Sequence, residues 1–287
     1  MTPANDGILS VMMPIYNEEQ TLALILGHVL SRSEVGEVIA VDDCSTDRSW
    51  EILQNVARND TRVRPLRQEP NQGKGAALRR AIKELSLPYA LVQDADLEYD
   101  PREYPILLEP LVEGRSDVVF GARGFAGQTA FSFWFVIGNK LVTLATNVLF
   151  NTYISDMETG YKALRSDLWT RLCLDGERFA IEPDITARVL RLGYRIHEVP
   201  ISYYARSRAE GKKLTWQDGV RALGALVSRR LRSQASLFGR ILEPEYHRNR
   251  QQALASRHPL MATIEPGPQA SSKGPATDVD DRDRAVR

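Results

Sequence analysis

The sequence contains little of several features that mark other classes of protein. Two cysteines, Cys44 and Cys173, occur among 287 residues, and neither belongs to a CxxC pair. This scarcity argues against a zinc site or a disulfide framework and fits a reducing compartment. The 37 basic and 37 acidic residues balance, so there is no global field to attract nucleic acid, and no nucleic-acid partner is expected.

Long apolar segments are absent as well. No run of about 18 uninterrupted apolar residues occurs, so the sequence predicts no transmembrane helix. Residues 1–7 lack a basic region followed by an apolar core, so no secretory signal is predicted, and we expect a flexible N-terminus there. These features together predict a cytoplasmic protein.

Short apolar runs do occur, and they alternate with helical patterns as far as Arg123. Strands are predicted at 8–13, 38–41, 63–67, 90–92 and 118–120, and helices at 18–31, after the cap residues 45–47 to about 58, at 76–85 and from about 101. Strands that alternate with helices predict an α/β fold, with a mostly parallel sheet and helices on both faces. Ligands of such sheets bind at the carboxyl ends of the strands.

The alternation breaks beyond Arg123. Helices are predicted at 164–174 and 182–192, a strand at 195–202, and a basic amphipathic helix at 216–237. From about residue 251 the apolar pattern gives way to proline, glycine, serine and charge, which predicts a disordered tail.

Two carboxylates, Asp94 and Asp96, follow the predicted strand at 90–92. A turn at the end of a strand can bring both round one ion, and hard oxygen ligands suit Mg²⁺ or Mn²⁺, which also bind phosphate oxygens. Glu98 is close enough in sequence to join them, directly or through water. The alternative is a solvated turn that caps the next helix, but the apolar strand just before it favours a metal site.

Other polar residues also fall at predicted strand ends and loops. Asp43 could accept the N–H of a uracil or guanine ring, or it could cap a helix, although residues 45–47 can already cap one. Tyr16 could stack on a base or pack in the core. Lys74 lies in the glycine-flanked loop 71–75, where it could reach phosphate or be solvated. This loop is not a Walker A motif, because the spacing and the Ser/Thr are missing.

Four motifs together resemble family 2 glycosyltransferases in order and spacing. They are PIYNE at 14–18, VDDCSTD at 41–47, NQGKG at 71–75 and QDADLE at 93–98. Over residues 8–225 the sequence is most similar to the branch with dolichol- and polyprenyl-phosphate mannosyl- and glucosyltransferases. The resemblance implies a Rossmann-like GT-A catalytic domain at 8–215, followed by a helical region at 216–250 and a tail at 251–287.

The resemblance also implies an activity and a set of roles. A hexose would pass with inversion from a nucleoside diphosphate sugar, GDP-mannose or UDP-glucose, to a polyprenyl-phosphate-like lipid. The metal ligands would be Asp94, Asp96 and Glu98. Donor contacts would come from Pro14, Tyr16, Glu18, Asp43, Lys74, Asp94, Ala95, Arg206 and Lys212. Arg123 would approach the phosphates of donor and acceptor. A basic loop with Arg206, Arg208, Lys212 and Lys213 would close over the diphosphate, or simply be solvated.

The segment SDMETGYK at 155–162 matches the acceptor-side motif of the family, with one departure. Glu158 is acidic where many mannosyltransferases have a small or neutral residue, which weakens an assignment to dolichol-phosphate mannose synthesis. A lipid phosphate is already anionic, with a second pKa of about 6, and needs no base. A hydroxyl acceptor would need one, and Asp156 or Glu158 would supply it. Rival functions are a nucleotidyltransferase and a non-catalytic nucleotide-sugar binding module.

Two apolar stretches, 131–150 and 216–240, could touch a membrane. The second sets arginines among apolar residues, as a helix lying at an anionic lipid surface does. The alternative is that both pack on the domain core or in the interface of a homo-oligomer. A lipid acceptor favours the first reading, with the protein bound peripherally at the cytoplasmic membrane face.

Overall fold

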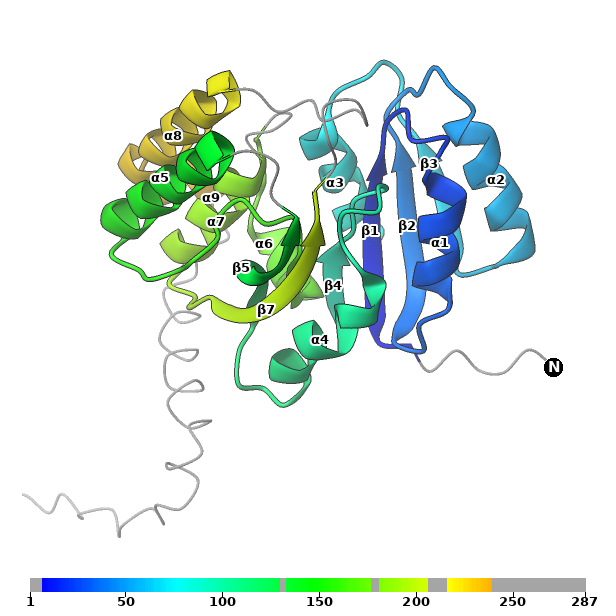
Figure 1. The fold of residues 1–287 in the computed structure, drawn as a ribbon, viewed down its shortest axis with the longest axis horizontal. Coiled ribbons are helices and arrows are strands. Elements are labelled where there is room, and N and C mark those ends of the chain that lie inside the picture. Colours follow the sequence, from blue (N-terminus) through cyan, green and yellow to red (C-terminus); the bar gives the residue numbers. More distant parts are fainter. Residues whose placement is uncertain (1–6, 130–132, 177–180, 206–215, 239–287) are drawn as a thin grey trace, which may run out of the picture.

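The protein is seen in a computed structural model that describes residues 7–129, 133–176, 181–205 and 216–238. Its centre is a seven-stranded sheet with the strand order β3-β2-β1-β4-β6-β5-β7 (Figure 1). The strands are β1 (Leu9–Ile15), β2 (Val35–Asp42), β3 (Val63–Arg67), β4 (Tyr89–Val92), β5 (Val118–Thr129), β6 (Lys162–Arg165) and β7 (His197–Tyr204). Strand β6 runs antiparallel to its neighbours β4 and β5, and the other pairs are parallel.

Helices cover both faces of this sheet, which confirms the predicted α/β fold. They are α1 (Leu22–Leu30), α2 (Ser49–Asn59), α3 (Lys74–Ile82), α4 (Tyr104–Val112), α5 (Phe133–Phe150), α6 (Ser166–Arg171), α7 (Ile181–Arg191), α8 (Trp216–Leu231) and α9 (Gln234–Phe238). A short 3₁₀ turn, Pro101–Glu103, precedes α4, where proline at the first position fits a helix start.

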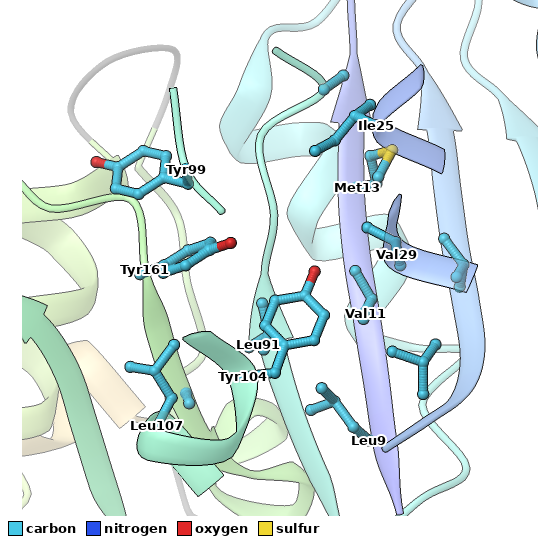
Figure 2. Packing of buried hydrophobic residues seen from close by; sticks show 14 of the residues in the cluster. Leu9, Val11, Met13, Ile25, Val29, Leu91, Tyr99, Tyr104, Leu107 and Tyr161 are labelled. Carbon is cyan, nitrogen blue, oxygen red and sulfur yellow. The ribbon is translucent and has the colours of Figure 1, made fainter. Parts of the chain in front are cut away.

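Alternation along each strand divides the apolar residues between two cores. Val11 and Met13 of β1 join a cluster with α1 and α4, whereas Met12 faces a cluster with α3, α6 and α7. Successive side chains of a strand point to opposite faces, so a sheet covered on both sides needs such continuous apolar runs. Figure 2 shows the first core, with Val11 and Met13 beside Ile25 and Val29 of α1.

Two predicted helices differ from the structure in a way that shows its physical cause. The helix expected at 164–174 begins at Ser166, because Leu164 and the residue after it belong to β6. Leu164 pairs with Ala90 of β4 and Val118 of β5, so burial in the middle of the sheet overrides its helical spacing. The helix expected at 216–237 is interrupted, since α8 ends at Leu231 and α9 begins at Gln234. The predicted tail and residues 1–6 lie outside the described residues.

The order of the strands decides where a site can form. From β1 the chain moves outward through β2 to β3 and then returns to place β4 on the other side of β1. Such a reversal opens a crevice at the carboxyl ends of the two strands that flank it. The segments after β1 and β4 therefore meet there, and they carry the PIYNE and QDADLE motifs.

Candidate active site

The loop after β4 carries Asp94 and Asp96, and it is fixed from beneath by Gln93. The amide oxygen of Gln93 accepts hydrogen bonds of 2.7 Å from the hydroxyls of both Tyr104 and Tyr161. Its amide nitrogen donates to the carbonyl of Asp94 at 3.0 Å. Because the side chains of Gln93, Tyr104 and Tyr161 are buried and hydrogen-bonded to one another, the backbone of Asp94 has little freedom.

Asp96 is held inside the same loop. The residue is 6% exposed, and Oδ1 accepts a hydrogen bond of 3.1 Å from the backbone N–H of Glu98. Between the two carboxylates, the carbonyl of buried Ala95 accepts from the hydroxyl of Thr21 at 3.0 Å. The segment after β1 and the segment after β4 are therefore joined directly.

A cluster of tyrosines supports the loop from the side of β7. Tyr99 stacks on Tyr161 with ring centroids 4.6 Å apart, and it lies 5.2 Å from the ring of Tyr203 (Figure 2 shows the first pair). The Tyr99 hydroxyl accepts a hydrogen bond of 2.7 Å from the N–H of Gly160. A Cβ at Gly160 would lie 2.8 Å from Oδ2 of Asp94, so this close approach needs glycine. The segment 155–162 thus reaches the Asp94 carboxylate.

Lys74 and Glu182 complete the surroundings of Asp94. The Lys74 ammonium lies 2.6 Å from Oδ1 of Asp94 and 2.7 Å from Oε1 of Glu182. Burial alone would lower the pKa of Lys74, but the two carboxylates outweigh it and hold that pKa well above its usual value. Lys74 is therefore a cation in contact with the predicted metal carboxylate.

Asp43 holds the loop that precedes α3. Its Oδ1 accepts hydrogen bonds of 2.8 Å from the Gln68 side chain and the N–H of Gln72, and Oδ2 accepts one of 2.7 Å from Gly73. A carboxylate offers about four acceptor positions, so one remains for a ligand. Asp43 does not cap the start of α2. Asp47 accepts a hydrogen bond there from the N–H of Ser49 at 2.9 Å.

The remaining donor residues predicted near β1 line the same edge. Tyr16 follows Pro14 and is 40% exposed, as a ring that stacks on a base must be. Glu18 has its N–H bound to the hydroxyl of Ser49 at 2.9 Å, and its carboxylate accepts from Thr21 at 3.2 Å. The predicted basic loop with Arg206, Arg208, Lys212 and Lys213 lies outside the described residues.

Arg123 and Asp156 form a buried pair on the other side of the site. Nε and Nη2 of Arg123 donate to the Asp156 carboxylate at 2.6 and 2.8 Å, and the Arg123 N–H adds a third bond at 3.1 Å. Burial would raise the pKa of Asp156, but the guanidinium holds it below its usual value. Asp156 is therefore a poor proton acceptor. Its hydrogen bonds also fix the guanidinium of Arg123, which lies 4.9 Å from the centre of the Tyr203 ring.

Glu158 has the opposite electrostatic character. Burial and the nearby Glu182 carboxylate raise its pKa to about 7, against the attraction of Lys162. Lys162 is itself buried beneath the loop, where it donates to the carbonyls of Met157 and Thr159, and burial lowers its pKa to about 8. Of the two carboxylates predicted as a base, Glu158 is the one suited to exchange a proton near neutral pH.

Glu98 links the loop after β4 to β7. Its Oε2 accepts a hydrogen bond of 2.8 Å from the Tyr203 hydroxyl, and its carbonyl accepts one of 3.0 Å from the N–H of Tyr204. One carboxylate oxygen is thus engaged by the protein. The role of Glu98 as a metal ligand stays a prediction.

The donor atoms around Asp94 fit a divalent metal that is shared with a substrate. Within the described ranges, no three His, Cys, Asp or Glu side chains gather closely enough to hold a metal ion by themselves. Mg²⁺ sites in proteins typically supply only one or two carboxylates and leave the other positions to substrate phosphates. Asp94 and Asp96 stay the predicted pair, and the contact with Lys74 shows that the Asp94 carboxylate faces a cation.

The chain also matches a family of known proteins. Residues 10–172 match the model described as Glycosyl transferase family 2. An undecaprenyl-phosphate mannosyltransferase of Micrococcus luteus is 29% identical over 211 residues, which cover 70% of this chain and 85% of that protein. A dolichyl-phosphate hexose transferase of Haloferax volcanii is 32% identical over 226 residues, covering 76% and 92%.

Solved structures show the same fold. Glucosyl-3-phosphoglycerate synthase from Mycobacterium tuberculosis, in complex with Mn²⁺, UDP-glucose and phosphoglyceric acid, superposes with a TM-score of 0.60. The match covers 80% of this chain and 82% of that one, at 21% identity. At this identity the likeness establishes the architecture alone.

Proposed function

Because the chain belongs to glycosyl transferase family 2, we propose that it transfers a hexose with inversion from a nucleoside diphosphate sugar to a polyprenyl phosphate. The observation that supports the proposal is that the Lys74–Asp94 contact and the Arg123–Asp156 pair both lie near the ring of Tyr99. One half presents carboxylates and an ammonium to a diphosphate, and the other presents a fixed guanidinium. The relatives with lipid-phosphate acceptors support the choice of acceptor.

On the donor side, each contact has a distinct task. Tyr16 would stack on the base, and the remaining acceptor position of Asp43 would bind a base N–H. Asp94 and Asp96 would hold Mg²⁺ or Mn²⁺, with Glu98 in a supporting position. A divalent metal bound there would neutralise charge on the departing diphosphate. Calorimetric titration with UDP and with GDP is the measurement that identifies the nucleoside.

On the acceptor side, the chemistry needs position and charge more than a base. A phosphate oxygen of the acceptor would attack the anomeric carbon as the bond from that carbon to the diphosphate breaks. Two nitrogens of Arg123 are held by Asp156, and Nη1 would contact the phosphates. A guanidinium fixed in advance stabilises developing charge without reorganising at the moment of reaction.

Glu158→Gln distinguishes a phosphate acceptor from a hydroxyl acceptor. With a lipid phosphate, turnover should stay within about tenfold of wild type, because glutamine keeps hydrogen bonding and no base is lost, whereas a lost general base typically costs about 10²–10⁴-fold. The measurement is kcat of the variant on polyprenyl phosphate across pH 5.5–8.5, with donor affinity determined separately.

The pKa of about 7 at Glu158 is the specific observation that favours the second candidate, transfer to a hydroxyl. In that case the wild-type rate should rise with pH as Glu158 ionises through about 7, and the glutamine variant should lose this rise together with at least about 10²-fold in kcat. That result with unchanged donor affinity would overturn the phosphate acceptor.

We propose further that α5 and α8 lie against a membrane surface. The two helices pack side by side (Figure 1), and each carries exposed apolar side chains at helical spacing. These are Leu141, Leu144 and Val148 on α5 and Val220, Leu223, Val227 and Leu231 on α8. Exposed Arg221 and Arg230 suit anionic headgroups. No helix within the described parts of the chain combines the length and apolarity needed to cross a bilayer.

Charged substitutions on this face test the membrane proposal. Leu144→Glu with Val227→Glu should lower binding to phosphatidylglycerol vesicles by at least about tenfold, because burying one leucine is worth about 1.5 kcal/mol or more and each tenfold step is about 1.4 kcal/mol. Leu24→Glu on α1 is the matched control, since Leu24 is 52% exposed and Leu144 is 56% exposed. Equal vesicle binding by the wild type, the double variant and Leu24→Glu in cosedimentation would contradict the membrane proposal and favour a protein interface at α5 and α8.

A further inference from the structure

The most unusual contact in the site is the ammonium of Lys74 between two carboxylates. It joins three elements that are far apart in the sequence: the first residue of α3, the loop after β4 and the first turn of α7. Lys74 is 21% exposed, Asp94 22% and Glu182 12%, so the three charges are largely shielded from water. Attraction between charges is stronger in such surroundings than at the surface.

The backbone places Lys74 and Glu182 opposite each other. A Cβ at Gly75 would lie 2.1 Å from the carbonyl oxygen of Gly176, which lies in the segment between α6 and α7. The start of α3 therefore touches the backbone of that loop. The same oxygen accepts a hydrogen bond of 2.8 Å from Arg79. From the other side, Asp184 of α7 accepts the N–H of Gly176 at 2.8 Å. Both helix starts are thus fastened to one loop.

This arrangement has a consequence for a metal at Asp94. Lys74 holds Oδ1 of that carboxylate at 2.6 Å, and a divalent ion on the same carboxylate would be repelled by the ammonium. Metal binding to the protein without donor must therefore displace Lys74 from Asp94. Glu182 offers Lys74 a second partner at 2.7 Å that does not depend on Asp94.

We propose that Glu182 is a positioning residue that retains Lys74 when its ammonium leaves Asp94 for the diphosphate of the donor. Lys74 pairs with Asp94 in the structure, and metal and nucleotide diphosphate would displace it together. The inference rests on the metal-dependent function proposed above. It predicts a reciprocal coupling: nucleotide strengthens metal binding because the diphosphate attracts Lys74 away from Asp94, and metal strengthens nucleotide binding equally.

The test is Mn²⁺ binding to the full chain, measured by electron paramagnetic resonance of free Mn²⁺ with and without UDP or GDP. Lys74→Met should bind Mn²⁺ alone about tenfold more tightly than wild type, and nucleotide should strengthen that binding less; couplings of about 5–150-fold are typical. Glu182→Gln should bind Mn²⁺ alone several-fold more weakly, because Lys74 then pairs with Asp94 only. Lys74→Gln repeats the first test with a polar side chain.

Opposite shifts in the two variants are the signature, since a merely structural role would weaken metal binding in both. Glu84→Gln is the control for charge: Glu84 lies beyond the far end of α3, paired with Arg64 at 3.0 Å, and its loss should leave Mn²⁺ affinity unchanged. In the Lys74→Met background, Glu182→Gln should have no further effect. If Glu182→Gln still weakens Mn²⁺ binding in the Lys74→Met background, or if both single variants shift Mn²⁺ affinity in the same direction, the inference is overturned but the metal site is not. Failure of the wild type to bind Mn²⁺ with either nucleotide overturns the metal site and the inference together.

Discussion

Asp96→Asn should reduce turnover by at least about 10³-fold while the protein stays folded. A metal ion that stabilises charge in the transition state contributes several kcal/mol, and each 1.36 kcal/mol is tenfold in rate. Asparagine keeps the volume, and its Oδ1 can still accept the 3.1 Å hydrogen bond from the N–H of Glu98. The change therefore removes a negative charge and little else. The measurement is kcat with saturating donor and Mn²⁺, together with the thermal unfolding midpoint.

A nearby carboxylate gives the control for this change. Asp100 lies four residues further along the same segment, where it caps the 3₁₀ turn by accepting the N–H of Arg102 at 2.9 Å. Asp100→Asn should keep most of the activity, and EDTA should stop the wild type. Full activity of Asp96→Asn, or a wild-type activity that EDTA does not change, would contradict the metal hypothesis.

Asp156→Asn should lower the free energy of unfolding by about 3–5 kcal/mol, because it leaves the buried guanidinium of Arg123 without a counter-charge. The Asp156 side chain is 2% exposed and that of Arg123 9%, so water cannot replace the lost partner. At about 2 °C per kcal/mol, the unfolding midpoint should fall by roughly 6–10 °C. The surface pair of Asp167 with Arg165, about 40% exposed on both sides, is the control, and Asp167→Asn should cost less than about 1 kcal/mol.

The same pair predicts a pH dependence of stability. Since the pKa of Asp156 is lower in the folded protein than its ordinary 3.8, its contribution is present above 3.8 and is lost as pH falls through the folded value. The difference in free energy of unfolding between wild type and Asp156→Asn should therefore shrink in acid. A difference that stays constant down to pH 2, measured by urea unfolding, would show that Asp156 stabilises the fold through something other than its charge.

The parallel half of the sheet could be predicted because its signals are local. The apolar runs 8–13 and 38–41 are followed by Pro14 and Asp42, and each became part of a strand that ends at the site. Residues 161–164 have a strand-like pattern, but that pattern does not show where β6 lies in the sheet. Residues 162–165 form a strand because the gap between β4 and β5 accepts an antiparallel partner, which is a property of the assembled sheet.

Some residues of the candidate site could likewise be predicted from a local signal in the sequence, and others could not. Asp94 and Asp96 could be singled out because they follow a strand closely. Glu182 could not, since its only local signal is an acidic residue in the first turn of a helix, which ordinarily complements the helix dipole. Its contact with Lys74, 108 positions earlier in the sequence, depends on Gly75 and Gly176 meeting through their backbones. The partner of Arg123 is hidden for the same reason.

Product analysis tests the proposed transfer most directly. Purified protein is incubated with Mn²⁺, a polyprenyl phosphate in detergent and hexose-labelled GDP-mannose or UDP-glucose, and the lipid and nucleotide products are separated by chromatography. We predict a labelled polyprenyl phosphate hexose, formed in equal amount with the nucleoside diphosphate and absent with Asp96→Asn. Release of pyrophosphate, or transfer of label only to a hydroxyl acceptor, would contradict the proposal.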